Sequence, residues 1–217
     1  MIAALVNLTP GVGRTTLAVN LAGELALQGK RVALMDVDGA SGVRDWAGMR
    51  RRNDLPALFD TVTITSAQLR CGLWGLGTSF DHVVIDTPAR SPAAVRAALL
   101  AAETVLVPTP PDREAVVRCA ATMQLVIEAL AVEPAMTAAL VLTRAPEGLV
   151  VDPGTEAGVL GLLLPVSAAV VRQRLAFATS CNTGLLVPEL EMAGRAEVDI
   201  RCLVSEVFGL GSVPVAG

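Results

Sequence analysis

Short apolar runs alternate with longer segments of mixed polarity along this chain. Runs that are apolar at nearly every position predict buried strands, whereas apolar residues that recur every three to four positions predict helices. Strands are expected at residues 3–8, 31–35, 61–65, 81–88, 104–107, 138–142 and 162–164. Helices are expected at residues 15–29, 41–52, 91–102, 112–131, 168–179 and 191–208, with a further one that ends near residue 75.

This alternation predicts the fold class. Strands that are apolar throughout are buried on both faces, and helices between them favour a parallel sheet covered on both sides. The class is therefore α/β, with a mostly parallel central sheet flanked by helices. A chain of 217 residues is long enough for one large core. We expect a single domain at 1–208 and a flexible tail at 209–217.

The amino-acid composition indicates which residues form the core and where in the cell the protein is located. Hydrophobic residues make up 53% of the chain and aromatic residues only 3%, so the core must consist of Ala, Val and Leu. No uninterrupted apolar run is long enough to span a membrane, and no basic segment precedes the first apolar run. We therefore expect a cytoplasmic protein without a membrane partner.

Charge and reactive side chains exclude several functions. The formal net charge of −4 argues against a strongly basic nucleic-acid-binding protein. The four cysteines are scattered without metal-ligand spacing, so neither a disulfide framework nor a zinc site is expected. The lone His82 lies in an apolar run and is expected to be structural. The basic run at 50–52 is expected to be a solvated helix end, with DNA contact as the alternative.

The segment between the first strand and the first helix has the composition of a phosphate-binding loop. Residues 9–16 place two glycines and two threonines after Pro10 and before a helical pattern. Glycines let backbone N–H groups converge on an anion, and a helix N-terminus adds unpaired donors and positive potential. The hydroxyl of Thr15 is placed to bind magnesium. A plain turn without a ligand is the alternative.

Polar residues also follow several of the other expected strands. Asp36 and Asp38 end the second strand, Asp86 ends the fourth, and Thr143 and Arg144 end the strand at 138–142. Ligands of open parallel sheets bind at the carboxyl ends of the strands. These residues and the glycine loop are therefore expected to lie at one edge of the sheet and to form a nucleotide site.

From Ala3 to Phe208 the chain resembles the ParA/MinD group of P-loop ATPases, which have a deviant Walker A motif. The group's loop has the pattern Lys-Gly-Gly-x-Gly-Lys-Thr-Thr, and residues 9–16 read Thr-Pro-Gly-Val-Gly-Arg-Thr-Thr. The group's Asp-x-Asp-Pro-Gln segment is similar to residues 36–40, and its Walker B strand is similar to residues 83–88. Length and the position of Trp46 look most like the small ParF-type plasmid partition proteins. The resemblance implies a three-layer P-loop NTPase fold.

The resemblance also implies roles for individual residues. Thr15 would bind Mg²⁺ and Asp86 would hold it through water. Asp38 would lie at the metal and position or activate the attacking water, with Arg14 as the other catalytic residue. Arg172 and Arg174 would contact DNA, although two residues this far apart on the expected helix do not share a face. The residues implied to contact ATP or ADP are Thr9, Pro10, Gly11, Val12, Gly13, Arg14, Thr15, Thr16, Thr143 and Arg144. Of these, the backbone amides of 11–16 would hold the phosphates, and Thr143 and Arg144 would lie near the adenine.

In this group ATP closes a sandwich dimer, the dimer binds DNA without sequence preference, and a partner protein stimulates hydrolysis. The resemblance therefore implies a homodimer, a ParB-like or ParG-like centromere-binding or adaptor protein as partner, nonspecific DNA, and association with the nucleoid. Such cycles position plasmids, chromosome origins or other cargo.

Two departures from the group's pattern bear on hydrolysis. Thr9 stands where the group has its signature Lys, and Arg14 stands where it has the Walker Lys. Phosphoryl transfer depends on positive charge at the transferred group, so weak hydrolysis is expected. Two alternatives follow: a non-hydrolysing pseudo-ATPase that acts as a nucleotide-regulated binding module, and a metabolic P-loop ligase or synthetase.

Overall fold

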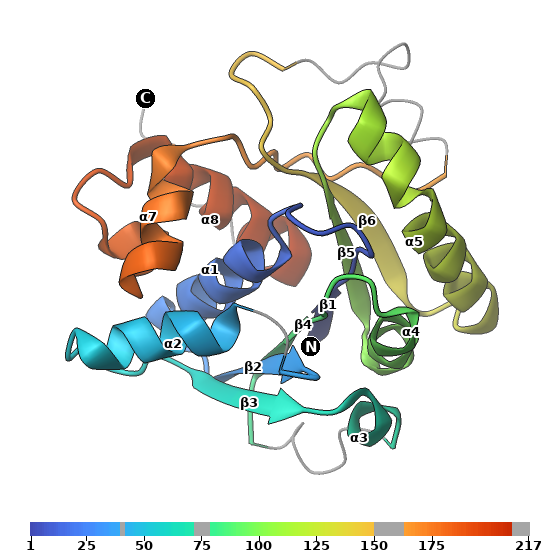
Figure 1. The fold of residues 1–217 in the computed structure, drawn as a ribbon, viewed down its shortest axis with the longest axis horizontal. Coiled ribbons are helices and arrows are strands. Elements are labelled where there is room, and N and C mark those ends of the chain that lie inside the picture. The colour runs from blue at the N-terminus through green and yellow to red at the C-terminus, as the bar shows by residue number, and fades with distance from the viewer. Residues whose placement is uncertain (40–41, 72–78, 150–162, 210–217) are drawn as a thin grey trace.

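The computed structural model describes residues 1–39, 42–71, 79–149 and 163–209. Six strands form one sheet in the order β3-β2-β4-β1-β5-β6, and all five neighbouring pairs are parallel (Figure 1). The parallel α/β sheet expected from the sequence is confirmed. The strands are β1 (Ile2–Leu5), β2 (Val32–Val37), β3 (Asp60–Ile64), β4 (His82–Asp86), β5 (Thr104–Thr109) and β6 (Thr137–Leu142).

Helices cover both faces of the sheet and complete three layers (Figure 1). One side carries α1 (Arg14–Leu27), α2 (Val43–Arg52), α7 (Leu175–Thr183), α8 (Gly194–Phe208) and the short 3₁₀ helix η1 (Val187–Glu189). The other side carries α3 (Ser66–Arg70), α4 (Pro92–Ala101) and α5 (Arg113–Val132).

The core consists of two apolar layers that the sheet separates. Along β1, Ala4 faces α4 and α5, whereas Leu5 faces α1 and α8, because successive side chains of a strand point to opposite faces. Both layers consist mainly of Ala, Val and Leu, as the composition predicts.

Helix α5 is long and apolar enough, by length and composition, to cross a membrane. Polar residues interrupt it at Arg118, Gln124 and Glu128, which is why no uninterrupted apolar run marks it in the sequence. One face of α5 packs on the sheet through residues such as Cys119 and Met123. This placement is that of a helix that covers one face of the sheet and leaves its other side exposed.

The expected helix at 168–179 is wrong in its first half. Of the expected strand at 162–164, the described residues 163 and 164 form a turn instead, and residue 162 lies outside the described ranges. Helix α7 begins only at Leu175, and residues 166–173 run extended along the open edge of β6. Val171 N donates to Leu142 O at 2.9 Å, and Ser167 N donates to Leu140 O at 2.8 Å. The unpaired edge of β6 thus keeps this segment extended, and its β-branched valines favour that conformation.

The expectation of a solvated basic helix end is confirmed for Arg51 and Arg52, which are exposed, and is wrong for Arg50, which is only 4% exposed. Arg50 Nη1 and Nη2 donate to the two carboxylate oxygens of Glu189 at 2.7 and 2.8 Å. Its Nε donates to Pro56 O, and its guanidinium lies over the ring of Trp46. Arg50 therefore joins α2 to η1, a contact that lies 139 residues away along the chain.

Several expectations fall on residues outside the described ranges. These are the end of the helix near residue 75, most of the segment at 145–161, and the tail from residue 210. His82, expected to be structural, packs edge-on against Phe208 with ring centroids 5.0 Å apart. Burial lowers the pKa of the His82 imidazole, as expected for a ring packed in this way.

Candidate functional site

The glycine loop lies at the carboxyl edge of the sheet, where the chain passes from β1 to α1 (Figure 1). Strand β1 lies between β4 and β5, so residues that end these two strands flank the loop on both sides. Asp86 ends β4 and Thr109 ends β5. This is the position at which open parallel sheets bind ligands.

Backbone geometry shapes the loop for an anion. Gly11 and Gly13 have φ angles of 73° and 92°, a left-handed conformation that glycine adopts without strain. Helix α1 begins immediately afterwards, and the first N–H groups of a helix have no partner within it. Thr143, at the end of β6, donates its hydroxyl to Val12 O at 2.8 Å and holds the loop from the side.

A buried amide supports the loop from below. Asn7 is fully buried; its Oδ1 accepts from Thr9 N at 2.8 Å and from the Thr122 hydroxyl at 3.3 Å, and its Nδ2 donates to Pro108 O at 2.9 Å. The same Thr122 hydroxyl accepts from Leu8 N at 2.9 Å. The start of the loop is therefore bound to α5 and to the end of β5. Asn7 was not predicted from the sequence, in which its only signal is a polar residue at the end of an apolar run.

Thr15 and Asp86 are brought into direct contact, as the sequence predicts for a magnesium site. Thr15 Oγ1 donates to Asp86 Oδ2 at 2.6 Å, and Asp86 is fully buried. Hydroxyl and carboxylate oxygens are the donors that Mg²⁺ prefers. The donor set beside the glycine loop therefore fits this ion.

The two other acidic residues of the site take different positions. Asp36 is buried on β2 and lies in register with Asp86 on β4, so both side chains project from the same face of the sheet. Asp38 lies just beyond β2 with a φ of 59°, and its Oδ1 accepts from Ser66 N at 2.7 Å at the start of α3. In this arrangement Asp38 is exposed and holds α3.

Arg14 is folded back onto the loop. Its side chain is only 8% exposed, and Nη1 donates to Thr9 O at 3.2 Å. Its Nε is buried without a hydrogen-bond partner among the described residues. Burial lowers the pKa of the Arg14 guanidinium, while the charge of Asp86 acts in the opposite direction. A buried cation with an unused donor beside a glycine loop fits a phosphate group.

Thr9 stands where the group has its signature Lys. Because threonine is neutral, this position adds no positive charge to the loop. It is 7% exposed, and its hydroxyl donates to Arg118 O on α5 at 3.3 Å. The predicted contact residue Thr9 is thus a structural link between the loop and α5.

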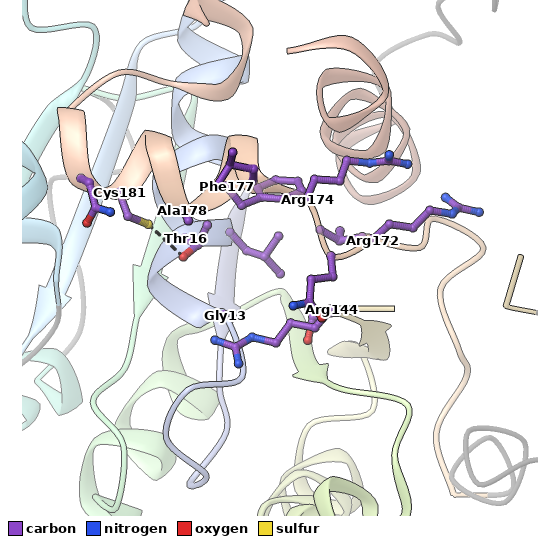
Figure 2. A pocket seen from close by; sticks show the side chains of 14 residues that line it. Gly13, Thr16, Arg144, Arg172, Arg174, Phe177, Ala178 and Cys181 are labelled. Atoms are coloured by element: carbon purple, nitrogen blue, oxygen red, sulfur yellow. Dashed lines mark hydrogen bonds between the residues drawn. The ribbon is translucent and has the colours of Figure 1, made fainter. Parts of the chain in front are cut away.

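A cavity of about 750 Å³ opens beside the loop, between the end of β6 and helix α7 (Figure 2). Its volume is in the range of pockets that hold small ligands. The predicted contact residues Gly13, Thr16, Thr143 and Arg144 line it, together with Phe177. The Thr16 hydroxyl also lies 3.1 Å from the thiol of Cys181 on α7. The structure thus brings these residues from distant segments to one cavity.

A second cavity of about 520 Å³ lies between the loop and the first turns of α5. Pro10, Gly11 and Val12 form one wall, and Arg118 of α5 forms part of another. Arg144 lines this cavity as well as the first one.

Arg172 and Arg174 are held in a cluster of ion pairs instead of lying free on a helix. Both guanidinium groups contact Asp199 of α8 at 3.2 Å, and both also contact Glu147, at 3.6 and 2.6 Å respectively. Because residues two apart in an extended segment point to the same side, the two side chains share one face. The expectation that they do not share a face is therefore wrong. Their contact with DNA stays a prediction.

Comparison with known proteins identifies the family. The CbiA family, described as the CobQ/CobB/MinD/ParA nucleotide binding domain, matches residues 3–184. The Maintenance of carboxysome distribution protein A of Halothiobacillus neapolitanus is 26% identical over 210 residues, which span 94% of this chain and 95% of that protein. The chromosome-partitioning ATPase Soj of Thermus thermophilus is 34% identical over 133 residues, which span 48% of this chain and 53% of Soj.

A solved structure shows the same fold. The ATP complex of a variant of the Cyanothece protein McdA superposes with a TM-score of 0.73 at 19% identity, and the match spans 98% of this chain and 97% of that one. The sheet order, the glycine loop and the acid at the end of β4 agree with this relationship. The chain therefore belongs to the CobQ/CobB/MinD/ParA family of nucleotide-binding domains.

Proposed function

We propose that this protein is a ParA-like ATPase that binds MgATP and positions an intracellular cargo. The relative from Halothiobacillus is named for the distribution of carboxysomes, and the match to it spans nearly all of both chains. The match to Soj, which is named for chromosome partitioning, covers about half of each chain. These two relatives favour positioning or partition over a metabolic reaction.

The observation that carries the proposal is the contact between Thr15 and Asp86. Their oxygen atoms lie 2.6 Å apart beside a loop whose two glycines have left-handed φ angles. In the proposed site these two residues hold Mg²⁺, and the amides of residues 11–16 hold the phosphates. The metal would supply positive charge at the transferred phosphoryl group.

Hydrolysis in this site would depend on Asp38 and Arg14. Asp38 would position the attacking water, which requires its carboxylate to leave Ser66 N and turn toward the loop. Arg14 would stabilise the charge that develops in the transition state, which requires its guanidinium to leave Thr9 O. Each of the two movements breaks one hydrogen bond, so we expect the protein to hydrolyse ATP slowly.

The remaining parts of the proposal concern partners. We propose a homodimer on ATP binding, nonspecific DNA as the surface on which the dimer moves, and a ParB-like or ParG-like adaptor that links it to cargo. Since the protein carries a net charge of −4, DNA binding would depend on local arginines and fall steeply with salt.

ATP binding and turnover by the purified protein test the proposal directly. We expect MgATP to bind and to be hydrolysed slowly, and Asp86→Ala to abolish the dependence on Mg²⁺. Arg14→Lys should raise turnover about tenfold, because a lysine ammonium is a compact point charge that reaches the phosphates without the Thr9 contact. Absence of MgATP binding in the wild-type protein would refute the proposal.

A second function, a nucleotide-regulated binding module without hydrolysis, is favoured by one observation. The family's loop has two lysines. In this chain one position holds the neutral Thr9, and the other holds Arg14, whose guanidinium is hydrogen-bonded to the loop itself. Binding of MgATP without turnover, combined with turnover by Arg14→Lys, would establish this function in place of the first.

A further inference from the structure

Strand β3 forms one end of the sheet, and among the described residues only β2 pairs with it (Figure 1). The carbonyl of Ile64 accepts from Asp38 N at 2.8 Å, so the backbone groups of Ile64 face β2. Alternate residues of a strand bond to the same neighbour, so the N–H and C=O groups of Thr61 and Thr63 face outward. Neither threonine has a backbone hydrogen bond to another part of the described chain. This edge therefore offers two donors and two acceptors to a further strand.

The opposite end of the sheet is closed. Residues 166–173 run along β6, and the carboxylate of Glu206 accepts from Ala168 N and Ala169 N at 3.2 and 2.9 Å. Open edges pair readily with other chains, and proteins usually block them with charged side chains, proline or a covering segment. Residues 61–65 read Thr-Val-Thr-Ile-Thr, a run that favours a strand and contains neither a charge nor proline. One edge is thus blocked, whereas the other is left able to pair.

A hollow of about 160 Å³ lies beside the open edge, between β3, α2 and the segment that joins them. Its volume is below the range of pockets that hold whole small ligands, and it suits a single side chain. Thr61 borders the hollow, which is otherwise mainly apolar and includes the stacked rings of Trp46 and Phe59. Ile64 packs in the layer on the α4 side of the sheet, so Thr61 and Thr63 point to the α2 side. Residues paired across two strands share a face, so a residue opposite Thr61 would place its side chain at the hollow.

Arginines of α2 make this side of the edge positively charged. Arg51 lines the hollow, and the side chains of Arg44 and Thr63 both lie next to Gly39. Both arginines are exposed, and neither forms an ion pair with a carboxylate of the described chain. No acid lines the hollow; the nearest in sequence are Asp45, Asp54 and Asp60.

We propose that this edge binds an extended acidic segment of a partner protein, which adds a strand to β3 and inserts one apolar side chain into the hollow. Backbone hydrogen bonds to Thr61 and Thr63 hold the segment, as in other complexes formed by strand addition. Arg51 and Arg44 meet acidic side chains that flank the apolar one on the same face. The surface shares no residue with the glycine loop or the proposed magnesium site, so it does not depend on the proposed function.

A second copy of the chain fits this edge less well. Two copies of β3 could pair about a twofold axis at Val62, with Thr61 opposite Thr63 of the other copy. That pairing brings Arg51 of each copy near Arg44 of the other, and like charges across a strand pair are destabilising. An acidic segment meets the same two arginines with opposite charge.

A synthetic peptide with the sequence Thr-Glu-Val-Leu-Val-Glu-Thr is the probe, because one face of this strand presents Glu, Leu and Glu in the order that the surface requires. Fluorescence anisotropy measures its binding to the nucleotide-free protein. We expect a dissociation constant of about 100 μM. The same peptide with lysine in place of both glutamates should bind about tenfold more weakly.

Two substitutions test the backbone and the charge separately. Thr63→Pro removes an outward N–H at an edge position that tolerates proline, so binding should weaken about tenfold while the melting temperature stays the same. Arg51→Glu should weaken binding of the acidic peptide about tenfold and allow the lysine peptide to bind instead. Arg52→Glu is the matched control, because Arg52 is the exposed neighbour of Arg51 and does not line the hollow.

Amide hydrogen exchange shows whether a strand is added. The acidic peptide should protect the amides of Thr61 and Thr63, whereas the amide of Val62 faces β2 and should be protected with and without peptide. No binding at about 1 mM peptide, or binding that neither Thr63→Pro nor Arg51→Glu changes, would overturn the proposal. Dimerisation without peptide or nucleotide that Thr63→Pro abolishes would show a second copy at this edge, and would overturn the acidic partner.

Discussion

Asn7 shows how a single buried side chain positions the phosphate loop. Its amide group joins Thr9 N, Pro108 O and the hydroxyl of Thr122, which belong to the loop, to β5 and to α5. All of these groups are buried, so each would lose a hydrogen bond that water cannot replace if the amide were absent. The loop's rigidity therefore depends on a residue that contacts no nucleotide.

We predict that Asn7→Ala lowers the free energy of unfolding by about 1–3 kcal/mol, because it leaves Thr9 N and Thr122 without their buried partner. It should also weaken ATP binding more than the loss of stability alone explains, since the loop loses its support. Urea unfolding and ATP titration measure the two effects. Asn53→Ala, which removes one exposed hydrogen bond to Thr183 O, is the control. An ATP affinity unchanged in Asn7→Ala would contradict the positioning role.

At the scale of elements, the ion pair between Arg50 and Glu189 joins α2 to η1 near the end of the domain. Burial of Glu189 raises its pKa, but hydrogen bonds from Arg50 and from Leu186 N outweigh burial and leave the pKa below its ordinary value of 4.5. A carboxylate whose pKa is lower in the folded state stabilises that state above the unfolded pKa. This stabilisation is lost as the pH falls through the folded pKa.

The lowered pKa of Glu189 predicts how the thermal stability of the protein depends on pH. Between pH 5 and 7 the wild type should melt at a higher temperature than Glu189→Gln, because the variant leaves Arg50 buried without a carboxylate. Below the ordinary pKa of 4.5 the difference should narrow as Glu189 takes up a proton. Melting curves of both proteins between pH 3 and 7 test this. A difference that stays constant down to pH 3 would disprove the linkage.

The cluster of Arg172, Arg174, Glu147 and Asp199 gives a second prediction at this scale. Asp199 is 6% exposed and compensates both arginines, so Asp199→Asn should lower the free energy of unfolding by about 2 kcal/mol. If the two arginines also contact DNA, the same substitution uncovers positive charge and should raise DNA affinity at low salt. Arg174→Gln should lower it. DNA affinity that neither substitution changes would exclude this pair from the DNA interface.

At the scale of the whole molecule, the site unites segments that begin and end the domain. The loop and α1 come from the first strand–helix unit, Asp86 from β4, and the cavity wall from β6 and α7. A ligand that contacts all of these segments stabilises the folded state as a unit, by an amount that grows with ligand concentration.

We therefore predict that MgATP at a hundred times its dissociation constant raises the free energy of unfolding by about 2.7 kcal/mol. Chelation of the metal should remove most of this gain, because Thr15 and Asp86 then lose the ion that joins them to the phosphates. In Asp86→Ala, ATP should raise the free energy of unfolding only slightly, both with and without the chelator. Thermal melting with ATP, ADP and EDTA measures this, and an equal gain with and without metal would contradict the assignment of Thr15 and Asp86.

Features that are encoded locally can be predicted from the amino-acid sequence of this chain. Apolar runs and helical periodicity identify all six strands and most helices, since each element's pattern depends on neighbours in the sequence. The glycine loop with Thr15 and the acid at Asp86 were found in the same way, and the structure confirms that Thr15 and Asp86 meet. Parallel strands place their ends at one edge, so the location of the site also followed from the pattern.

Features that depend on contacts between distant segments arise only when the chain folds. The extended path of 166–173 depends on the open edge of β6. The burial of Arg50 depends on its contact with Glu189. The support that Asn7 gives the loop depends on Thr122 of α5. Arg144 lines the cavities on both sides of the loop because folding brings the end of β6 next to residues 10–13. A sequence window records the polarity of these residues, whereas their partners lie tens of residues or more away and are brought near only by folding.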